Sequence, residues 1–387
     1  MSLFTRLSTS YFFYFAIIGL VAPYLGVFLN GKGFSSLQIG EILAIVTATK
    51  IFAPTLWATL ADKKGFQLPI IKTGSLLALL FFSLLYWLDT YWSLTACLAL
   101  FSLFSTAILP QLEVMTLNSI RRSAKIYARI RLWGSLGFIA IAIIAGDLLE
   151  RFPLYAFSVI GVLALLGLLG SSFLLSQPRI PASHKTKQSS IIDKIIDRRF
   201  ILFFLSGVFL QISFGPYYGF FALYLNDLNY PGITIGLIIG LGVIAEIITF
   251  IFAGSLFRWF SLKSLLIFSL FATVLRWVLV ANYGENLLLL IFSQLLHAAS
   301  FGLYHSVSIQ FLTQHFDANQ QSRGQALYIS GLYGVGGSIG AYIAGVLWLD
   351  GAGAQTTFNF AAFSVFIGAV FIMFLPELKP TLKKCKP

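Results

Sequence analysis

Seven ionisable side chains lie inside long apolar segments of this 387-residue chain. They are Lys50, Glu113, Arg131, Glu246, Arg276, His297 and His305. Charged groups at membrane depth are costly, and they usually face a partner or a polar cavity on a substrate or proton path. With the histidines neutral, the three bases and two acids leave a net positive charge, which suits an anionic substrate.

Two of these groups, Glu113 and Glu246, are candidates for proton transfer. Burial disfavours the ionised form of a carboxyl group, whereas a nearby arginine favours it. A glutamate balanced between these effects can take up and release a proton as a cavity alternates its exposure. Other interpretations stay open, because Glu113 and Arg131 lie near segment ends, where side chains reach the interface. Either His297 or His305 can also be a packing residue.

The composition identifies the solvent that surrounds these groups. Hydrophobic residues make up 58% of the chain, charged residues make up 10%, and the mean hydropathy is +0.87. Soluble domains carry about 25% charged residues, and a soluble core of this size could not enclose so many apolar side chains. We therefore expect an all-α polytopic membrane protein with the lipid bilayer as its partner. Cys97 and Cys385 form no disulfide or metal pattern, and the first apolar run is too long for a cleaved signal.

Twelve apolar segments are long enough to cross a bilayer as helices, which satisfy their own backbone groups in hydrocarbon. The expected spans are 10–30, 37–60, 69–88, 92–118, 127–148, 153–175, 200–225, 233–257, 263–282, 287–314, 323–348 and 356–375.

The net charge of +12 lies mostly in short loops, which indicates orientation rather than nucleic-acid binding. If the N-terminus is cytoplasmic, the outside loops hold only Lys32 and Arg151 as basic residues. The bias predicts a protein of the bacterial cytoplasmic (inner) membrane with both termini in the cytoplasm.

A polar stretch divides the chain into two halves. We expect an N-terminal six-helix bundle over 1–176, a cytoplasmic linker over 177–199 and a C-terminal six-helix bundle over 200–387 with a short basic tail. Leu29-Asn30 and Ile39-Gly40 recur 196 positions later as Leu225-Asn226 and Ile235-Gly236. Such parallel repeats are typical of the major facilitator fold, with substrate bound between the halves.

The loop after the second span begins Ala58-Thr59-Leu60-Ala61-Asp62-Lys63-Lys64-Gly65. It resembles the major facilitator signature G-x-L-x-D-R/K-x-G-R/K. Asp62, Lys63 and Gly65 match, whereas Ala58 and Phe66 depart from it. The resemblance implies a charged conformational latch at the helix end. The alternative is an ordinary basic cytoplasmic loop.

The segment Arg129-Ile130-Arg131-Leu132-Trp133-Gly134-Ser135-Leu136-Gly137-Phe138 is similar to the start of helix 5 in the lactose permease family. That resemblance implies that Glu113 and Arg131 bind substrate together. It also implies that Glu246, Arg276 and His297 form the network that links substrate to protons. Ser300 stands where that family has its proton-carrying glutamate.

Further segments resemble the phenylpropionate-permease branch of the superfamily. They are Tyr217-Tyr218-Gly219-Phe220, Gly242-Val243-Ile244-Ala245-Glu246-Ile247-Ile248, Leu275-Arg276-Trp277 and Gln294-Leu295-Leu296-His297. Lys50 stands where that branch has a basic residue. The resemblance implies a proton symporter for 3-phenylpropionate or a similar aromatic acid, with Tyr217, Tyr218 and Trp277 stacking on its ring. The alternative is that these aromatic residues only pack between helices.

Other classes of function fit less well. The glycine run at 334–340 lies in a membrane span without a preceding strand, so we expect helix packing and no cofactor. No metal-ligand cluster or nucleophile motif indicates an enzyme, and a receptor or scaffold has no need of costly intramembrane charges. A sugar or nucleoside symporter and a drug or metabolite exporter remain alternatives. We expect a monomer that handles a small molecule and protons and binds no nucleic acid.

Overall fold

The computed structural model describes residues 2–64, 67–120, 123–177, 190–317 and 319–376, and the regular elements among them are helices. Twelve helical segments of these residues are long and apolar enough to cross a membrane. Each overlaps one of the twelve predicted spans, so the predicted fold class is confirmed at this level.

Most spans are single helices. They are α1 (Leu3–Gly31), α2 (Ser36–Lys64), α3 (Gln67–Leu84), α6 (Ala124–Arg151), α7 (Pro153–Phe173), α11 (Gly232–Trp259), α12 (Leu262–Tyr283) and α17 (Ala354–Met373). The other spans are interrupted. They are α4 (Tyr91–Ser105) with α5 (Ile108–Ser119), α9 (Arg198–Ser213) with α10 (Gly215–Asp227), α13 (Leu287–Leu295) with η1 (Ala298–Leu303) and α14 (Tyr304–His315), and α15 (Gln321–Ile329) with η2 (Ser330–Gly336), α16 (Gly337–Trp348) and η3 (Leu349–Gly351). A short helix, α8 (Ile192–Ile195), precedes α9.

The interruptions have identifiable causes. Pro110 and Pro216 lie in the first turns of α5 and α10, where a missing backbone N–H is tolerated and the preceding helix ends. The segments η1 and η2 are π-helical, with one residue more per turn than usual, a feature often found at functional sites. Both lie in the second half of the chain.

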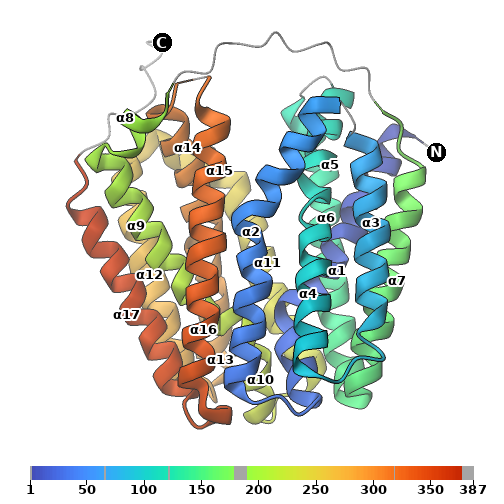
Figure 1. Ribbon diagram of the computed structural model, residues 1–387. Coiled ribbons are helices and arrows are strands. Elements are labelled where there is room, and N and C mark those ends of the chain that lie inside the picture. The colour runs from blue at the N-terminus through green and yellow to red at the C-terminus, as the bar shows by residue number, and fades with distance from the viewer. Residues whose placement is uncertain (1, 65–66, 121–122, 178–189, 318, 377–387) are drawn as a thin grey trace.

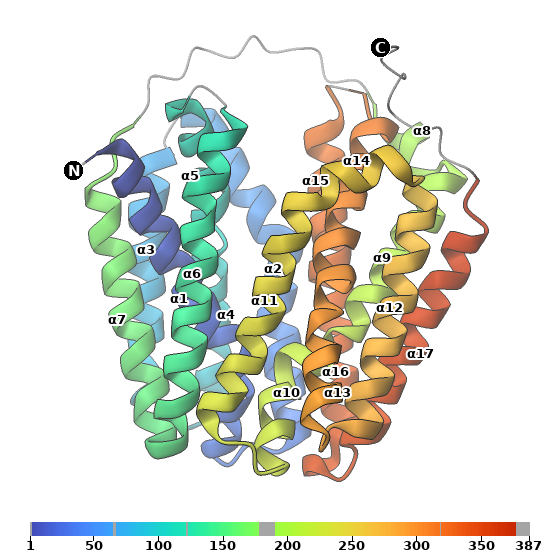
Figure 2. The same cartoon turned by 180° about the vertical axis from the view of Figure 1, so that it is seen from behind.

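The helices form two bundles, α1–α7 and α9–α17, which stand side by side (Figures 1 and 2). The start of α1, the end of α7, the start of α9 and the end of α17 lie at one end of the molecule, here called the linker end (Figure 1). The opposite end is called the far end. The first predicted domain limit, between 176 and 177, falls after α7, and the second, between 199 and 200, falls in the first turn of α9. Residues 178–189 between them are outside the described residues, so the domain limits stay a prediction.

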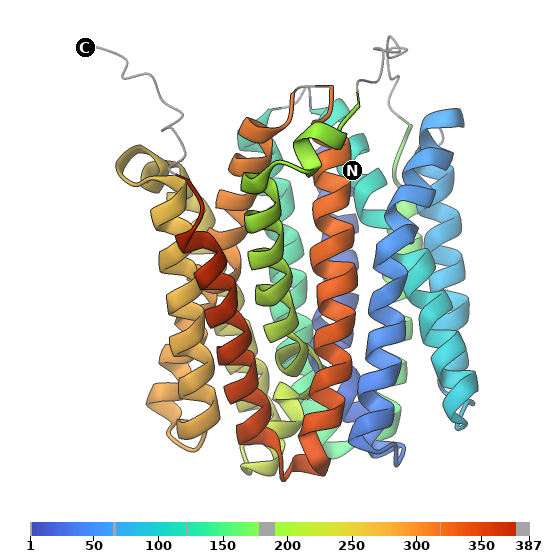
Figure 3. The same cartoon turned by 60° about the vertical axis from the view of Figure 1, so that its left-hand side comes forward.

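The two bundles touch mainly through two helix pairs, α6 with α11 and α2 with α16; the second pair is seen in blue and orange in Figure 3. Small residues bring the backbones together. A Cβ atom on Gly40 of α2 would lie 2.5 Å from the Cα atom of Gly345, and one on Gly236 would lie 2.6 Å from the carbonyl oxygen of Ala142. Side chains are too large for these positions, so both contacts require glycine.

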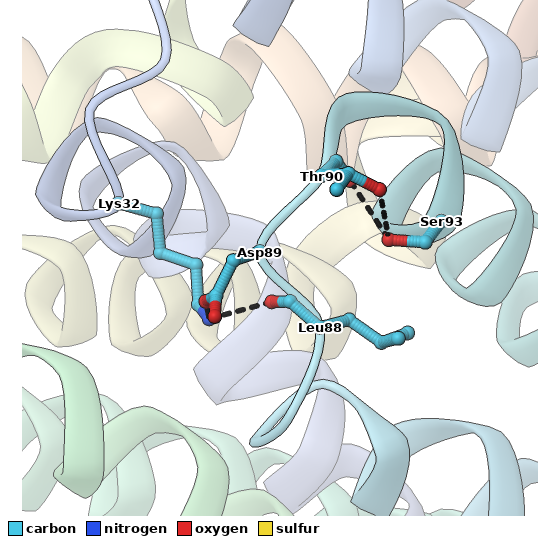
Figure 4. Close-up of polar contacts among 5 residues, drawn as sticks. All are labelled: Lys32, Leu88, Asp89, Thr90 and Ser93. Carbon is cyan, nitrogen blue, oxygen red and sulfur yellow. Dashed lines mark hydrogen bonds and ion pairs between the residues drawn. The ribbon is translucent and has the colours of Figure 1, made fainter.

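At the far end, basic loop residues are paired with acidic ones. The Nζ atom of Lys32 donates to Oδ1 of Asp89 at 2.5 Å and to the carbonyl oxygen of Leu88 at 2.7 Å (Figure 4). Arg151 donates to Oδ1 of Asp147 at 2.9 Å, one turn away on α6. Each of the two basic residues that we predict in the outside loops is therefore paired with an acidic residue of the first bundle.

Candidate functional site

A cavity of about 430 Å³ lies between the two bundles. Helices α1, α2, α4 and α6 supply one wall, and α10, α11, η1, η2 and α16 supply much of the other. Its volume falls in the range of pockets that enclose small molecules. The site therefore forms where the two halves meet, as parallel repeats predict.

Six of the predicted site residues line this cavity. They are Lys50, Arg131, Tyr217, Tyr218, Glu246 and His297. The first two come from the first bundle, and the others come from the second. Residues from the two halves of the sequence thus line the same cavity.

The two cations on the wall are available to a ligand. Lys50 is exposed on α2, and the guanidinium carbon of Arg131 lies 3.8 Å from the ring centroid of Phe15. No described carboxylate forms an ion pair with either residue. An anion entering the cavity would therefore meet two positive groups that form no ion pair with a described carboxylate.

One carboxylate on the wall has a partner. Glu246 Oε2 lies 3.8 Å from His297 Nε2, and the two side chains are largely buried. Glycines allow this approach, because a Cβ atom on Gly302 would lie 3.2 Å from Cγ of Glu246, and one on Gly242 would lie 3.3 Å from the His297 ring. A carboxylate and an imidazole at this distance can share a proton through small movements.

Arg276 and Trp277 are behind the wall rather than on it. Both are fully buried in the second bundle, and neither lines the cavity. The Arg276 guanidinium carbon lies 4.3 Å from the ring centroid of Tyr217 and 4.2 Å from that of Trp277, while Nη2 donates to Gln294 Oε1 at 3.3 Å. Trp277 Nε1 donates to Ser213 Oγ at 3.0 Å. Tyr217 lines the cavity and Trp277 does not, so the stacking of Trp277 on substrate stays a prediction that this conformation does not support.

The structure brings together only part of the predicted network of Glu246, Arg276 and His297. Among the described residues, the ion-pair partner of Glu246 is His297, and the neighbours of Arg276 are aromatic rings and an amide. Burial explains the difference, because the Arg276 side chain points into its own bundle.

Glu113 departs from the expectation as well. It accepts a hydrogen bond from the Tyr127 hydroxyl at 3.1 Å and does not line the cavity. No ion pair joins it to Arg131 among the described side chains. Only Arg131 of this pair thus faces the chamber in this conformation.

Sequence reasoning missed most of the apolar wall. The missed rings are Tyr14, Phe15, Phe101, Phe138, Phe221, Phe301 and Tyr333. Phe301 and Tyr333 come from the two π-helical segments, and Tyr333 lies beside His305, with its hydroxyl 3.4 Å from Nδ1. In a chain with 16% aromatic residues, no sequence signal separates these rings from those that face lipid.

The remaining predicted features are not placed by the structure. Gly65 is outside the described residues, as are the side chains of Asp62 and Lys63, so the latch stays a prediction. Within the described ranges, no group of three His, Cys, Asp or Glu side chains is arranged to hold a metal ion.

Comparisons with known proteins agree with this architecture. The chain is 27% identical over 342 residues to the probable 3-phenylpropionic acid transporter of Escherichia coli (strain K12), covering 86% of this chain and 87% of the relative. It is 25% identical over 381 residues to the maltose permease of Geobacillus stearothermophilus, covering 96% and 94%. A crystal structure of the nucleoside transporter NupG superposes with a TM-score of 0.80 at 17% identity, covering 97% of this chain and 99% of that one.

The profile of the MFS_1 like family matches residues 4–360, which is most of the chain. With twelve spans and a chamber between two bundles, the chain belongs to this family of major facilitator transporters and is a multi-pass membrane protein that moves small molecules, not an enzyme.

Proposed function

We propose that this transporter is a proton-coupled symporter that imports an aromatic carboxylate such as 3-phenylpropionate. The observation that carries the proposal is the cavity wall, where Lys50 and Arg131 form no ion pair with a described carboxylate and stand among aromatic rings. A carboxylate would be held by the two cations, while a phenyl ring would pack against Tyr217 and Tyr218.

The relative named as a probable 3-phenylpropionic acid transporter supports the same substrate class. A substrate anion also needs a driving force to accumulate against a negative membrane potential. The Glu246–His297 pair supplies a proton-binding site on the same wall. Protonation there as the anion binds would offset its charge and couple the two movements.

We also propose that the linker end is cytoplasmic. Described basic residues such as Arg6, Arg198 and Lys263 lie at the helix ends there, whereas Lys32 and Arg151 are the only basic residues among the described ones at the far end, each paired with an acid. In the conformation described, the bundles meet at glycine contacts near the far end. Import then requires this seal to open towards the outside.

A sugar or nucleoside is the second candidate, because hydroxyl and amide side chains also line the cavity. They include Thr47, Ser102, Ser105, Thr106, Ser135 and Gln211. Such groups suit a ligand rich in hydroxyls, and maltose and xanthosine permeases are among the relatives.

Binding and uptake by the purified protein in proteoliposomes test the proposal. We expect 3-phenylpropionate to stabilise the protein and to accumulate when the outside is acidified. We expect 3-phenylpropanol, its neutral analogue, to bind at least about tenfold more weakly, because it lacks charge-assisted hydrogen bonds. Equal binding of acid and alcohol would contradict the carboxylate assignment, and stabilisation by maltose or xanthosine alone would favour the second candidate.

A further inference from the structure

A carboxylate of the second bundle caps a helix of the first bundle at the far end. Asp350 lies in η3, directly after α16, and Ser36 is the first residue of α2. Asp350 Oδ1 accepts hydrogen bonds from the Ser36 backbone N–H at 2.8 Å and from its hydroxyl at 2.6 Å. The Asp350 N–H donates in return to Ser36 Oγ at 2.7 Å.

The same arrangement recurs with the bundles exchanged. Glu150, near the end of α6 in the first bundle, accepts a hydrogen bond at Oε2 from the N–H of Gly232 at 2.7 Å. Gly232 is the first residue of α11. Ser36 and Gly232 are separated by 196 positions, which is the offset of the sequence repeat. Each bundle thus caps the first turn of one helix in the other.

Physical chemistry explains why these contacts hold the bundles together. The first N–H groups of a helix lack intrahelical partners and carry a partial positive charge, so a carboxylate there is stabilised. One turn deeper, Gly40 meets Gly345 and Gly236 meets Ala142, backbone against backbone. The caps therefore reinforce an interface that is already closely packed.

The backbone around Asp350 is unusual. Leu349 and Asp350 have φ values of 48° and 49°, in the left-handed region that residues with a Cβ atom seldom adopt. Such conformations persist where surrounding contacts hold them, and they cluster at functional and switching positions. Here the turn brings the carboxylate of Asp350 to the neighbouring bundle.

We propose that Asp350 and Glu150 form a pair of interbundle caps that keep the transporter closed at the far end and release when the cavity opens there. The two caps act on the two helix pairs, α2 with α16 and α6 with α11, that join the bundles. This role does not depend on which substrate the cavity takes.

Distance measurements between spin labels at the far end test the proposal. Labels are attached to cysteines that replace Thr90 in the first bundle and Glu285 in the second, both exposed, after Cys97→Ala and Cys385→Ser remove the natural thiols. We expect Asp350→Asn with Glu150→Gln to raise the ratio of long to short distances by about tenfold, because the amide oxygens can still accept these hydrogen bonds but lack the negative charge that strengthens them. Asp350→Asn alone should act more strongly than Glu150→Gln, since Asp350 accepts two of these bonds.

A matched control separates capping from net charge. Asp147 lies one turn before Glu150 on α6, and its carboxylate bonds to Arg151 within the same bundle. Asp147→Asn should leave the distance distribution unchanged. An unchanged distribution in the double variant, or an equal shift in the control, would overturn the proposal. Ser36→Ala keeps all carboxylates but removes both hydrogen bonds between its hydroxyl group and Asp350, so it should also shift the distribution towards long distances, and it serves as the readout if the double variant fails to fold.

Discussion

Two arginines of this transporter sit over aromatic rings but face different surroundings. Arg131 covers Phe15 on the wall of the central cavity, whereas Arg276 is fully buried between Tyr217 and Trp277. Both are arginines within apolar spans, so the sequence assigns both to the functional network. The comparison shows that depth in the membrane identifies a costly charge, while the direction of the side chain decides whether a ligand can reach it.

The glutamates repeat the contrast. Glu246 lies on the cavity wall beside His297, and Glu113 lies off the wall beside Tyr127. We therefore expect that substitutions on the wall change transport and binding, and that substitutions behind it change mainly stability. The following experiments test this division, beginning with the largest expected effect.

Glu246→Gln should abolish accumulation against a gradient, because the glutamine cannot carry a proton. Removing such a group typically lowers a proton-dependent step by about 10²–10⁴-fold. The measurement is uptake into proteoliposomes with an imposed pH gradient, alongside exchange of internal for external substrate, which should continue. Glu113→Gln is the matched control and should accumulate substrate normally. Loss of accumulation in both variants would contradict our expectation that only the glutamate on the cavity wall takes part in transport.

Arg131→Gln should weaken substrate binding by about 10–100-fold, because a charge-assisted hydrogen bond contributes about 1.5–3 kcal/mol. Titration of the purified protein with 3-phenylpropionate measures the dissociation constant. Arg276→Gln serves as the comparison, and we expect its effect on affinity to be severalfold smaller because Arg276 does not line the cavity. Similar losses in both variants would show that Arg276 acts on the substrate through Tyr217.

Trp277→Ala should destabilise the protein by about 3–5 kcal/mol, because it removes a fully buried aromatic side chain and leaves a void. Thermal unfolding in detergent measures this change. Tyr218→Ala, at a half-buried cavity position, should be less destabilising and should instead weaken binding by about fivefold, through loss of aromatic contact. The reverse pattern would restore Trp277 as a substrate contact.

Tyr333→Phe should have the smallest effect. It removes only the hydroxyl that lies 3.4 Å from His305 Nδ1 and keeps the ring on the cavity wall. The net contribution of a hydrogen bond to stability is about 0.5–1.5 kcal/mol. Because this bond is long, we expect at most about a threefold change in substrate affinity. A larger change in the initial uptake rate would assign the hydroxyl a direct substrate contact.

The spans could be predicted because hydrocarbon permits only helices whose backbone groups are satisfied internally. Hydropathy therefore located the twelve spans of the described residues, and the charge pattern located Lys50, Arg131, Glu246 and His297, which line the cavity. The offset between Ser36 and Gly232 shows that the repeat also carries real structural equivalence.

The direction in which each side chain points could not be predicted as well as the spans. Successive helix positions differ by about 100°, so an uncertainty of one residue moves a side chain from the cavity to its own bundle. Glu113 and Arg276 illustrate this limit, since their types and depths fitted the site and their directions did not. The π-helical turns at Ala298–Leu303 and Ser330–Gly336 add a further local rotation that a hydropathy pattern does not record.

Lys32 lies between α1 and α2, and it bonds to Leu88 and Asp89 in the loop between α3 and α4. This contact joins the two helical hairpins, α1–α2 and α3–α4, at the far end. The Lys32 ammonium group is largely buried and also bonds to a backbone carbonyl, so dissolved salt weakens this contact only in part. Four helices are thereby tied at one point. We therefore expect these four helices to move together at the far end when the bundles separate there.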